Sequence, residues 1–320
     1  VDELSGEGLA GFRSMPGPLD YFVPTYGFPA YGSHPGRFDP VRESLAALQL
    51  EDGRTGALLE RLLSGEAQAE SDFRVLQAGD RVDAAPYLSS FSESTIGRPL
   101  EQFSFEGRRF SRSSLNYLLG LAFLKRHCDT SAIRTVLEIG AGFGSLGEVL
   151  LADPRNECFY ADVDIPPTLH AATYYLKSVL GSEAVFDYED AKRSPAIDLR
   201  TLARTHRAAT LATWQLPRIS GQVDLFVNFI SFQEMEPAVV RNYLQHADRL
   251  QSRLVLLRNL REGKAKARDA DDVGRVAEPV LGSMYDGFLG NYRLLATSTM
   301  PFGYRTVDGF HSQLRLYERV

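Results

Sequence analysis

The sequence has 320 residues, a formal net charge of −6 and 44% hydrophobic residues, enough to bury one large core. Its basic residues are scattered rather than gathered in a stripe, which excludes the usual footprint of a nucleic-acid binder. Two cysteines exclude a disulfide-rich secreted scaffold, and no apolar run reaches the length of a membrane span. We therefore expect a globular cytoplasmic protein with neither nucleic-acid nor membrane partners.

The first third of the chain predicts a cap rather than a regular domain. Residues 1–38 are rich in glycine, proline and aromatic residues, which indicates an irregular arm packed through its rings. Asp39-Pro40 is a helix-start signal, and the leucines between 45 and 63 predict two short helices interrupted at Gly53. Alternating apolar residues in FRVL (73–76) and EQFSFEGRRF (101–110) predict short strands. We expect residues 1–110 to shape an acceptor pocket.

Residues 111–320 predict an α/β domain. A helix is expected over 111–128, where apolar residues recur at helical spacing after a polar SRSS start. Five short apolar runs then predict strands at 134–139, 158–164, 209–213, 223–230 and 253–259, with helices between them at 145–153, 166–181, 194–204 and 236–251. This alternation predicts a doubly wound, mostly parallel sheet with helices on both faces. Runs at 291–298 and 312–320 predict an antiparallel pair, which gives seven strands with an antiparallel last strand.

The stretch VLEIGAGFGSLGE (136–148) predicts a nucleotide-type cofactor site, because glycines between a strand and a helix expose backbone N–H groups to a ligand. Two motif phases are possible. Gly142, Gly144 and Gly147 satisfy the dinucleotide pattern G-x-G-x-x-G, whereas Glu138 with Gly140, Gly142 and Gly144 gives E-x-G-x-G-x-G. The second phase fits the strand better, since Gly140 follows VLEI immediately.

With Glu138 and this glycine loop, the chain resembles class I S-adenosylmethionine-dependent methyltransferases, whose seven-stranded sheet ends in an antiparallel hairpin. The resemblance implies S-adenosylmethionine as cofactor and S-adenosylhomocysteine as product. It also implies that an acid ending the second strand, Asp164 or alternatively Asp162, binds the ribose hydroxyls. Trp214 and Gln215 follow the third strand, where such enzymes contact adenine. As the only tryptophan, Trp214 is equally expected in the core.

A closer resemblance covers roughly residue 72 to the end. It is carried by FSES, GRPLEQF, SRSSLNYLLGLAFLK, ADVDIPPTLHAATYYLKSVLG, WQLP, VDLFVNFISFQEMEP, LLRNLREGK and PFGYRTVDGFHS. These strings resemble a family of sugar O-methyltransferases from antibiotic and polysaccharide gene sets. The resemblance implies methylation of a sugar hydroxyl, with a sugar or glycoside as the small-molecule acceptor. A homodimer is among the assemblies expected.

Methyl transfer to a hydroxyl requires a base that removes the proton as the new bond forms. The last strand runs antiparallel, so its beginning lies at the edge of the sheet where the parallel strands end. This predicts His311 as the base, oriented by Asp308 or Glu234, with Glu234 as the alternative base. Ser231 is expected near the methionine moiety, and Arg112 is expected to clamp a carboxylate.

Several alternatives stay open at this stage. Asn228 is expected to be structural, and Arg258 either binds an acidic acceptor or pairs with a helix. Asp187, Glu189 and Asp190 form an acidic cluster that we expect to be solvated, so no metal is predicted. His34 would reach the site if the arm closed over it.

Two rival functions also stay open. A nicotinamide-dependent sugar epimerase or dehydrogenase would use the first glycine phase, together with a Tyr-x-x-x-Lys pair that we expect to be absent. A noncatalytic cofactor-binding subunit would keep the glycine loop but need no base.

Overall fold

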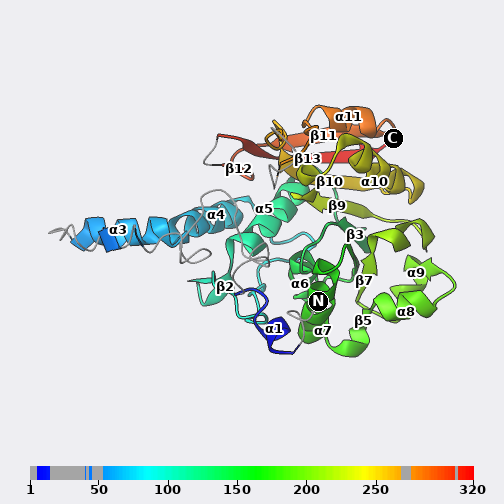
Figure 1. Cartoon of the computed structure of the whole chain (residues 1–320), viewed down its shortest axis with the longest axis horizontal. Helices are drawn as coiled ribbons and strands as arrows, with labels where there is room; N and C mark the ends of the chain where they lie inside the picture. The colour runs from blue at the N-terminus through cyan, green and yellow to red at the C-terminus, as the bar shows by residue number, and fades with distance from the viewer. Residues whose placement is uncertain (1–5, 15–39, 41–42, 45–52, 268–274, 307–308) are drawn as a thin grey trace.

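The structure is a computed structural model that describes residues 6–14, 40, 43–44, 53–267, 275–306 and 309–320. At its centre is a nine-stranded sheet in the order β11-β13-β10-β9-β3-β4-β7-β5, with β12 pairing β13 (Figure 1). Its strands are β3 (Thr135–Ile139), β4 (Phe159–Asp164), β5 (Val185–Phe186), β7 (Ala208–Ala212), β9 (Leu225–Phe229), β10 (Leu254–Leu260), β11 (Tyr292–Ser298), β12 (Tyr304–Arg305) and β13 (His311–Arg319).

The doubly wound α/β fold is confirmed. Strands β5, β7, β4, β3, β9 and β10 pair in parallel, and β13 runs antiparallel between β10 and β11. All seven predicted strands are present. The prediction of seven strands is nevertheless wrong in number, because the two-residue strands β5 and β12 extend the sheet; runs this short have no alternation for a pattern to detect.

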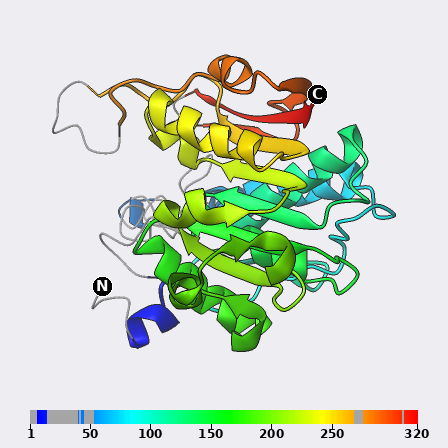
Figure 2. The same ribbon diagram turned by 90° about the vertical axis from the view of Figure 1, so that its right-hand side faces the viewer.

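Helices cover both faces of the sheet, as Figures 1 and 2 show. One face packs on α5 (Arg112–His127), α6 (Ser145–Leu151) and α7 (Thr168–Leu180). The other packs on α8 (Tyr188–Arg193), α9 (Leu199–Leu202), α10 (Pro237–Arg249) and α11 (Met284–Phe288). Alternate residues of each strand enter the two cores: Val136 faces the first, and its neighbour Leu137 the second. Each face therefore has its own apolar layer.

The cap contains α1 (Glu7–Ala10), α3 (Gly53–Leu63), α4 (Glu66–Gly79) and the hairpin of β1 (Phe103–Phe105) and β2 (Arg108–Phe110). Helix α4 packs on α5, whereas α3 buries no residue and extends away from the sheet in Figure 1. The boundary between residues 110 and 111 stays a prediction. Among the residues that the structure describes, no helix is long and apolar enough to span a bilayer.

Two element predictions were wrong. Residues 73–76 belong to α4 and not to a strand, because Ala69, Phe73 and Leu76 share the helix face that is buried. The helix expected over 194–204 is reduced to α9, since Ile197–Asp198 forms β6 and pairs with β8 (Ile219–Ser220). The predicted helix after Gly53 is confirmed by α3, and the short strands predicted within 101–110 are confirmed by β1 and β2, which pair as a hairpin. Asp39 and the leucines before Gly53 lie outside the described residues.

Candidate functional site

A tight glycine turn joins β3 to α6 at the carboxyl edge, the edge where the parallel strands end. Gly140, Gly142 and Gly144 have φ values of 68°, 65° and 87°, a region that side chains other than glycine rarely adopt. A Cβ at Gly140 would lie 2.0 Å from Ser231 Oγ, whereas a Cβ at Gly142 would meet no atom of the described residues within 4 Å. Packing explains the bare backbone at Gly140; at Gly142 that backbone faces open space where a ligand can approach.

Gly147 has a packing role in α6. A Cβ there would lie 2.6 Å from the Tyr160 ring on β4. Close helix–strand packing is also the role of the third glycine in the dinucleotide pattern, so this contact fits either motif phase. Gly140 favours the E-x-G-x-G-x-G phase, because it forms the first residue after β3 and has no room for a side chain.

Asp164 ends β4 beside this turn. Its carboxylate accepts hydrogen bonds from the N–H groups of Gly142 at 2.8 Å and Ile165 at 2.7 Å. Burial raises the pKa of Asp164 to about 6, although these two donors lower it. Asp164 therefore fixes the glycine turn and stays close enough to the surface, at 8% exposed, to meet a ligand hydroxyl.

Two further carboxyl groups lie side by side on β3 and β4 beneath the turn. Glu138 accepts a hydrogen bond from the Tyr160 hydroxyl at 2.6 Å, and burial raises its pKa to about 8. Asp162 pairs with Glu138 in the sheet register and is fully buried, with no hydrogen-bond partner for either oxygen in the described part of the chain. Burial raises the pKa of Asp162 well above its usual range, with nearby Asp164 and Glu138 adding to the effect. The turn thus sits on acids that favour their neutral forms.

The 3-10 turn η4 (Thr213–Arg218) follows β7 and carries the two predicted adenine contacts. Trp214 is 56% exposed and meets the Tyr188 ring edge-on at 6.0 Å, so its alternative place in the core was wrong. Gln215 is buried, and its carbonyl oxygen accepts a hydrogen bond from the Ala212 N–H at 2.9 Å. Gln215 therefore shapes the turn, while Trp214 presents an exposed ring at the carboxyl edge. Ala212, next to this turn, pairs with Asp164.

The 3-10 turn η5 (Ser231–Glu234) follows β9 and supports the glycine turn from below. Asn228 donates to the Ile139 carbonyl at 2.8 Å and to Ser231 Oγ at 2.6 Å. Glu234 is exposed and pairs with Lys264 at 2.9 Å. These contacts agree with the structural role expected for Asn228. They also mean that Glu234 does not orient His311.

His311 begins β13 at the carboxyl edge, where its neighbour Ser312 pairs with the last residue of β10. Its Nδ1 lies 2.8 Å from Glu262 Oε1, and its backbone N–H donates to Glu262 Oε2 at 2.8 Å. Burial opposes ionisation, yet these hydrogen bonds and one from Arg261 lower the pKa of Glu262 to about 2. Glu262, rather than the predicted Glu234, orients the imidazole. The expected alternative orienter, Asp308, lies outside the described residues, as does His34.

Sequence reasoning missed Glu262, although a signal was present. Glu262 is the second residue after β10, which ends at the carboxyl edge of the sheet. Since the antiparallel strand β13 begins at the same edge, the sequence could have placed Glu262 beside the start of β13. His311 itself lies three strands from β3 in the sheet order. With about 4.8 Å between neighbouring strands, that is roughly 14 Å across the edge.

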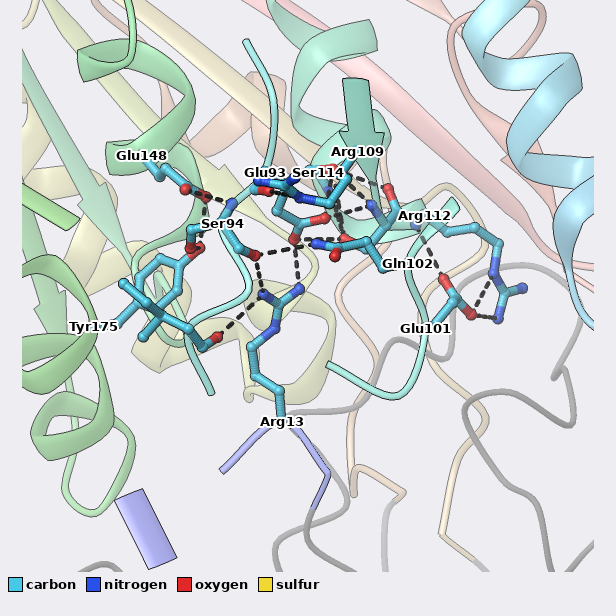
Figure 3. A network of polar contacts seen from close by, with 12 residues as sticks. Arg13, Glu93, Ser94, Glu101, Gln102, Arg109, Arg112, Ser114, Glu148 and Tyr175 are labelled. Carbon is cyan, nitrogen blue, oxygen red and sulfur yellow. Dashed lines mark hydrogen bonds and ion pairs between the residues drawn. The ribbon is translucent and has the colours of Figure 1, made fainter. Parts of the chain in front are cut away.

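Arg112 is buried at the junction between cap and sheet. Its guanidinium donates to Glu101 at 2.7 and 2.9 Å and to Gln68 at 3.0 Å, as the right side of Figure 3 shows for the Glu101 pair. These partners belong to the cap. The prediction that Arg112 clamps a cofactor carboxylate is therefore corrected to an ion pair that holds α5 to the cap.

A second buried ion pair in Figure 3 ties the N-terminal segment to the same junction. Arg13 pairs with Glu93, which also accepts hydrogen bonds from Ser111 at the start of α5. Next to it, Glu148 of α6 accepts from the Ser94 N–H at 2.8 Å and from the Tyr175 hydroxyl. The Arg13 guanidinium also lies 4.9 Å from the centre of the Phe143 ring, inside the glycine turn. The arm, the cap and the turn are therefore linked directly.

The acidic cluster and the Tyr-x-x-x-Lys spacing considered in the sequence both map to helix α8. Asp187 caps α8 through the N–H groups of Glu189 and Asp190, and within the described ranges no group of three or more acids, histidines or cysteines could hold a metal. The expected absence of a Tyr-x-x-x-Lys pair was wrong, because Tyr188 and Lys192 have that spacing on α8. Lys192 is exposed and lies 3.9 Å from Glu189.

No family model matches this sequence, and no curated protein matches it significantly. Solved structures match weakly. The mitomycin 7-O-methyltransferase MmcR is 18% identical with a TM-score of 0.41, over 66% of this chain and 55% of that one. The magnesium protoporphyrin IX methyltransferase ChlM from Synechocystis, with bound S-adenosylhomocysteine, is 13% identical with a TM-score of 0.42, over 65% and 84%.

A third match is the dimethyltransferase RosA from Streptomyces davawensis, 15% identical with a TM-score of 0.40, over 63% of this chain and 54% of that one. The aligned region thus spans only about half of MmcR and RosA. At these scores the similarity adds nothing to the fold already described. The narrower resemblance to sugar O-methyltransferases stays a prediction, and the functional argument depends on the geometry of this chain.

Proposed function

We propose that this protein is an S-adenosylmethionine-dependent O-methyltransferase that acts on a hydroxyl of a small molecule, a sugar or glycoside. The observation that carries the proposal is the glycine turn at 140–144, bare at Gly142 and tied to Asp164, on a sheet with an antiparallel strand between β10 and β11. The dinucleotide-binding fold has the order 3-2-1-4-5-6 without such an insertion. The strand order therefore favours the methyltransferase over the nicotinamide-dependent rival.

The residues at the carboxyl edge fit this cofactor. Asp164 would accept the ribose hydroxyls, the turn at Gly142 would approach the cofactor backbone, and the exposed Trp214 ring would stack on adenine. The bound cofactor supplies an electrophilic methyl group. The acids beneath the turn favour their neutral forms, so they add little negative charge to the site.

His311 is the proposed base. Since Nδ1 is engaged with Glu262, Nε2 is the ring nitrogen left to take the proton from the acceptor hydroxyl. Glu262 stays ionised, because its pKa is about 2, and it stabilises the imidazolium that forms. Glu262 therefore acts as a positioning residue, like the carboxylate in other sites where an acid orients a histidine that serves as the base.

The test is calorimetric titration of the full chain with S-adenosylhomocysteine and, in parallel, with NAD⁺. We expect S-adenosylhomocysteine to bind and Asp164→Asn to weaken binding about tenfold or more, because a charge-assisted hydrogen bond is lost. Asp224→Asn is the matched control: Asp224 also accepts two backbone N–H groups, from Arg134 and Thr135, but before β9 at the opposite edge. NAD⁺ binding, or silence with S-adenosylhomocysteine, would sink the proposal.

The catalytic part is tested separately with His311→Gln. This variant should retain S-adenosylhomocysteine binding and lose methyl transfer by about 100-fold or more, as general-base catalysis commonly contributes. Unchanged transfer would remove His311 from the mechanism without touching the cofactor assignment. A noncatalytic subunit predicts a different result, namely no methyl transfer in the parent protein or in the variant.

A further inference from the structure

Asn116 is a buried polar residue on α5 that the chain leaves unsatisfied. It is 4% exposed, and neither its amide nitrogen nor its amide oxygen has a hydrogen-bond partner in the described structure. Buried amides are almost always hydrogen-bonded, because an unpaired one loses its water without replacement. An amide kept in this state at a functional edge is a candidate ligand contact.

The position of Asn116 on α5 is fixed by its neighbours one turn away. Arg112 precedes it by four residues and Gly120 follows by four, so all three share one helix face. A Cβ at Gly120 would lie 2.3 Å from the Phe229 ring, and the Arg258 guanidinium lies 5.3 Å from the centre of that same ring. Asn116 therefore sits between Arg112 and the Phe229–Arg258 pair.

The cap closes this region from the other side with α4. Asp72 of α4 is partly exposed, and both Arg258 and Arg112 act on its carboxyl group electrostatically. Burial raises the pKa of Asp72 to about 6 despite the two arginines, which lower it. Gln68, one turn earlier on α4, accepts a hydrogen bond from Arg112 at 3.0 Å. The face of α4 that carries Gln68 and Asp72 thus looks toward the two arginines.

The charges of this cluster indicate the kind of group that it binds. Arg112 forms an ion pair with Glu101, and Arg258 and Arg112 both act electrostatically on Asp72, so the described cluster contains two basic and two acidic side chains and shows no excess of either charge. Its polar atoms include acceptors on Asp72 and both donors and acceptors on Asn116. A neutral group that donates and accepts at several positions fits best, and a ring with several hydroxyls is such a group.

The cluster also lies next to the proposed cofactor site. Phe229 is the last residue of β9, and Tyr117 stacks on its ring at 5.0 Å. The Tyr117 hydroxyl in turn lowers the pKa of Glu138 beneath the glycine turn. One aromatic side chain therefore touches both regions.

We propose that Asp72 and Asn116 bind the hydroxyl groups of a neutral sugar ring, between α4 and the ends of β9 and β10, and hold it for methylation. The identification of this ring as the methyl acceptor rests on the proposed function. Asp72 and Asn116 are specificity-determining residues in this proposal, and they are distinct from His311 and from the glycine turn.

The experiment is saturation-transfer difference NMR on the full chain saturated with S-adenosylhomocysteine. The probes are the methyl α-glycosides of glucose, galactose and rhamnose. We expect a saturation-transfer signal from at least one of these glycosides, and we expect Asn116→Leu and Asp72→Asn each to reduce that signal about fivefold or more. Glu70→Gln is the control on α4, since Glu70 pairs with Arg61 and Arg74 instead. Tyr285→Phe is the control for Asn116, because it also removes a buried polar atom that has no hydrogen-bond partner among the described residues.

Thermal unfolding keeps the result interpretable. Asn116→Leu should unfold at the same or a higher temperature than the parent, because it replaces an unsatisfied amide with an apolar group of similar size. If Asn116→Leu is as stable as the parent or more stable, loss of the saturation-transfer signal supports a binding role for Asn116. Two results overturn this proposal and leave the cofactor assignment intact. One is an equal saturation-transfer signal in parent and variants, and the other is no saturation-transfer signal from any glycoside while S-adenosylhomocysteine still binds. Failure of S-adenosylhomocysteine to bind overturns the proposed function itself.

Discussion

The cap junction and the base of the glycine turn both contain buried carboxyl groups, but only those at the junction have cationic partners among the described residues. At the cap junction, Glu93 and Glu101 are paired with Arg13 and Arg112 at 1% exposure or less. Beneath the glycine turn, Glu138 and Asp162 are as deeply buried, but no cation pairs with either among the described residues, and burial raises both pKa values. The first two acids have guanidinium partners and a structural role; the second two favour their neutral forms.

This difference separates architecture from function. A paired buried charge has its partner inside the chain, so it fixes the position of the elements that carry it. Acids without a cation cost stability, and strongly perturbed groups of this kind gather at functional sites more often than elsewhere. The cap junction therefore organises the molecule, whereas the acids at the carboxyl edge belong to the candidate site.

Breaking one buried ion pair should have the largest effect. Arg112→Met leaves Glu101 buried without its guanidinium, which should lower the free energy of unfolding by about 3–5 kcal/mol. The double variant Arg112→Met/Glu101→Gln should recover much of this loss, because no unpaired charge remains. Urea denaturation measures both. Equal losses in the single and double variants would show that packing, and not charge pairing, holds the junction.

Glu138 should show the opposite behaviour with pH. Its folded pKa of about 8 lies above the ordinary value of 4.5, so between these values the folded state keeps a proton that the unfolded state has released. The folded protein should therefore lose stability as pH rises from about 4.5 to 8, by on the order of 4 kcal/mol. Glu138→Gln should reduce this loss above pH 6, where Asp164 no longer contributes and only the part due to buried Asp162 remains. Denaturation midpoints at pH 6 and 8.5 that fall equally in parent and variant would contradict the assignment.

The sequence predicted the sheet well and the site only in part, for physical reasons. Strands such as β4 and β9 are continuous apolar runs between helices, so period and length identify them. The glycine turn was predictable because it combines a strand end with a helix start. Periodicity did not reveal the partner of Arg112, Glu101, which lies 11 residues away, and it related Glu262 to His311, 49 residues away, only through the order of the strands. Polar pairing depends on the packed fold, and periodicity does not encode it.

The glycine turn offers a contrast within three residues. Gly142→Ala should cost about 1–2 kcal/mol of backbone strain, because φ is positive but space is open. Gly140→Ala adds a clash with Ser231 and should cost more. S-adenosylhomocysteine binding should weaken out of proportion to stability only in Gly142→Ala, since that position faces the ligand. Calorimetry paired with urea denaturation separates the two effects, and a parallel fall in both variants would mean that the turn acts only as a structural unit.

The smallest expected effect belongs to Glu262, an ionised acid that is one-third exposed and acts on His311. Its folded pKa of about 2 lies below the ordinary value of 4.5, so its contribution to stability is present above about pH 4.5 and is lost as pH falls toward 2. Solvent screening limits this contribution to less than about 1 kcal/mol. Glu262→Gln should therefore leave stability near pH 7 almost unchanged, yet it should change the pH profile of methyl transfer, because the imidazolium loses its anionic partner. A positioning role predicts that the profile midpoint moves and that kcat falls. An unmoved midpoint together with unchanged kcat would make Glu262 a surface residue like Glu234.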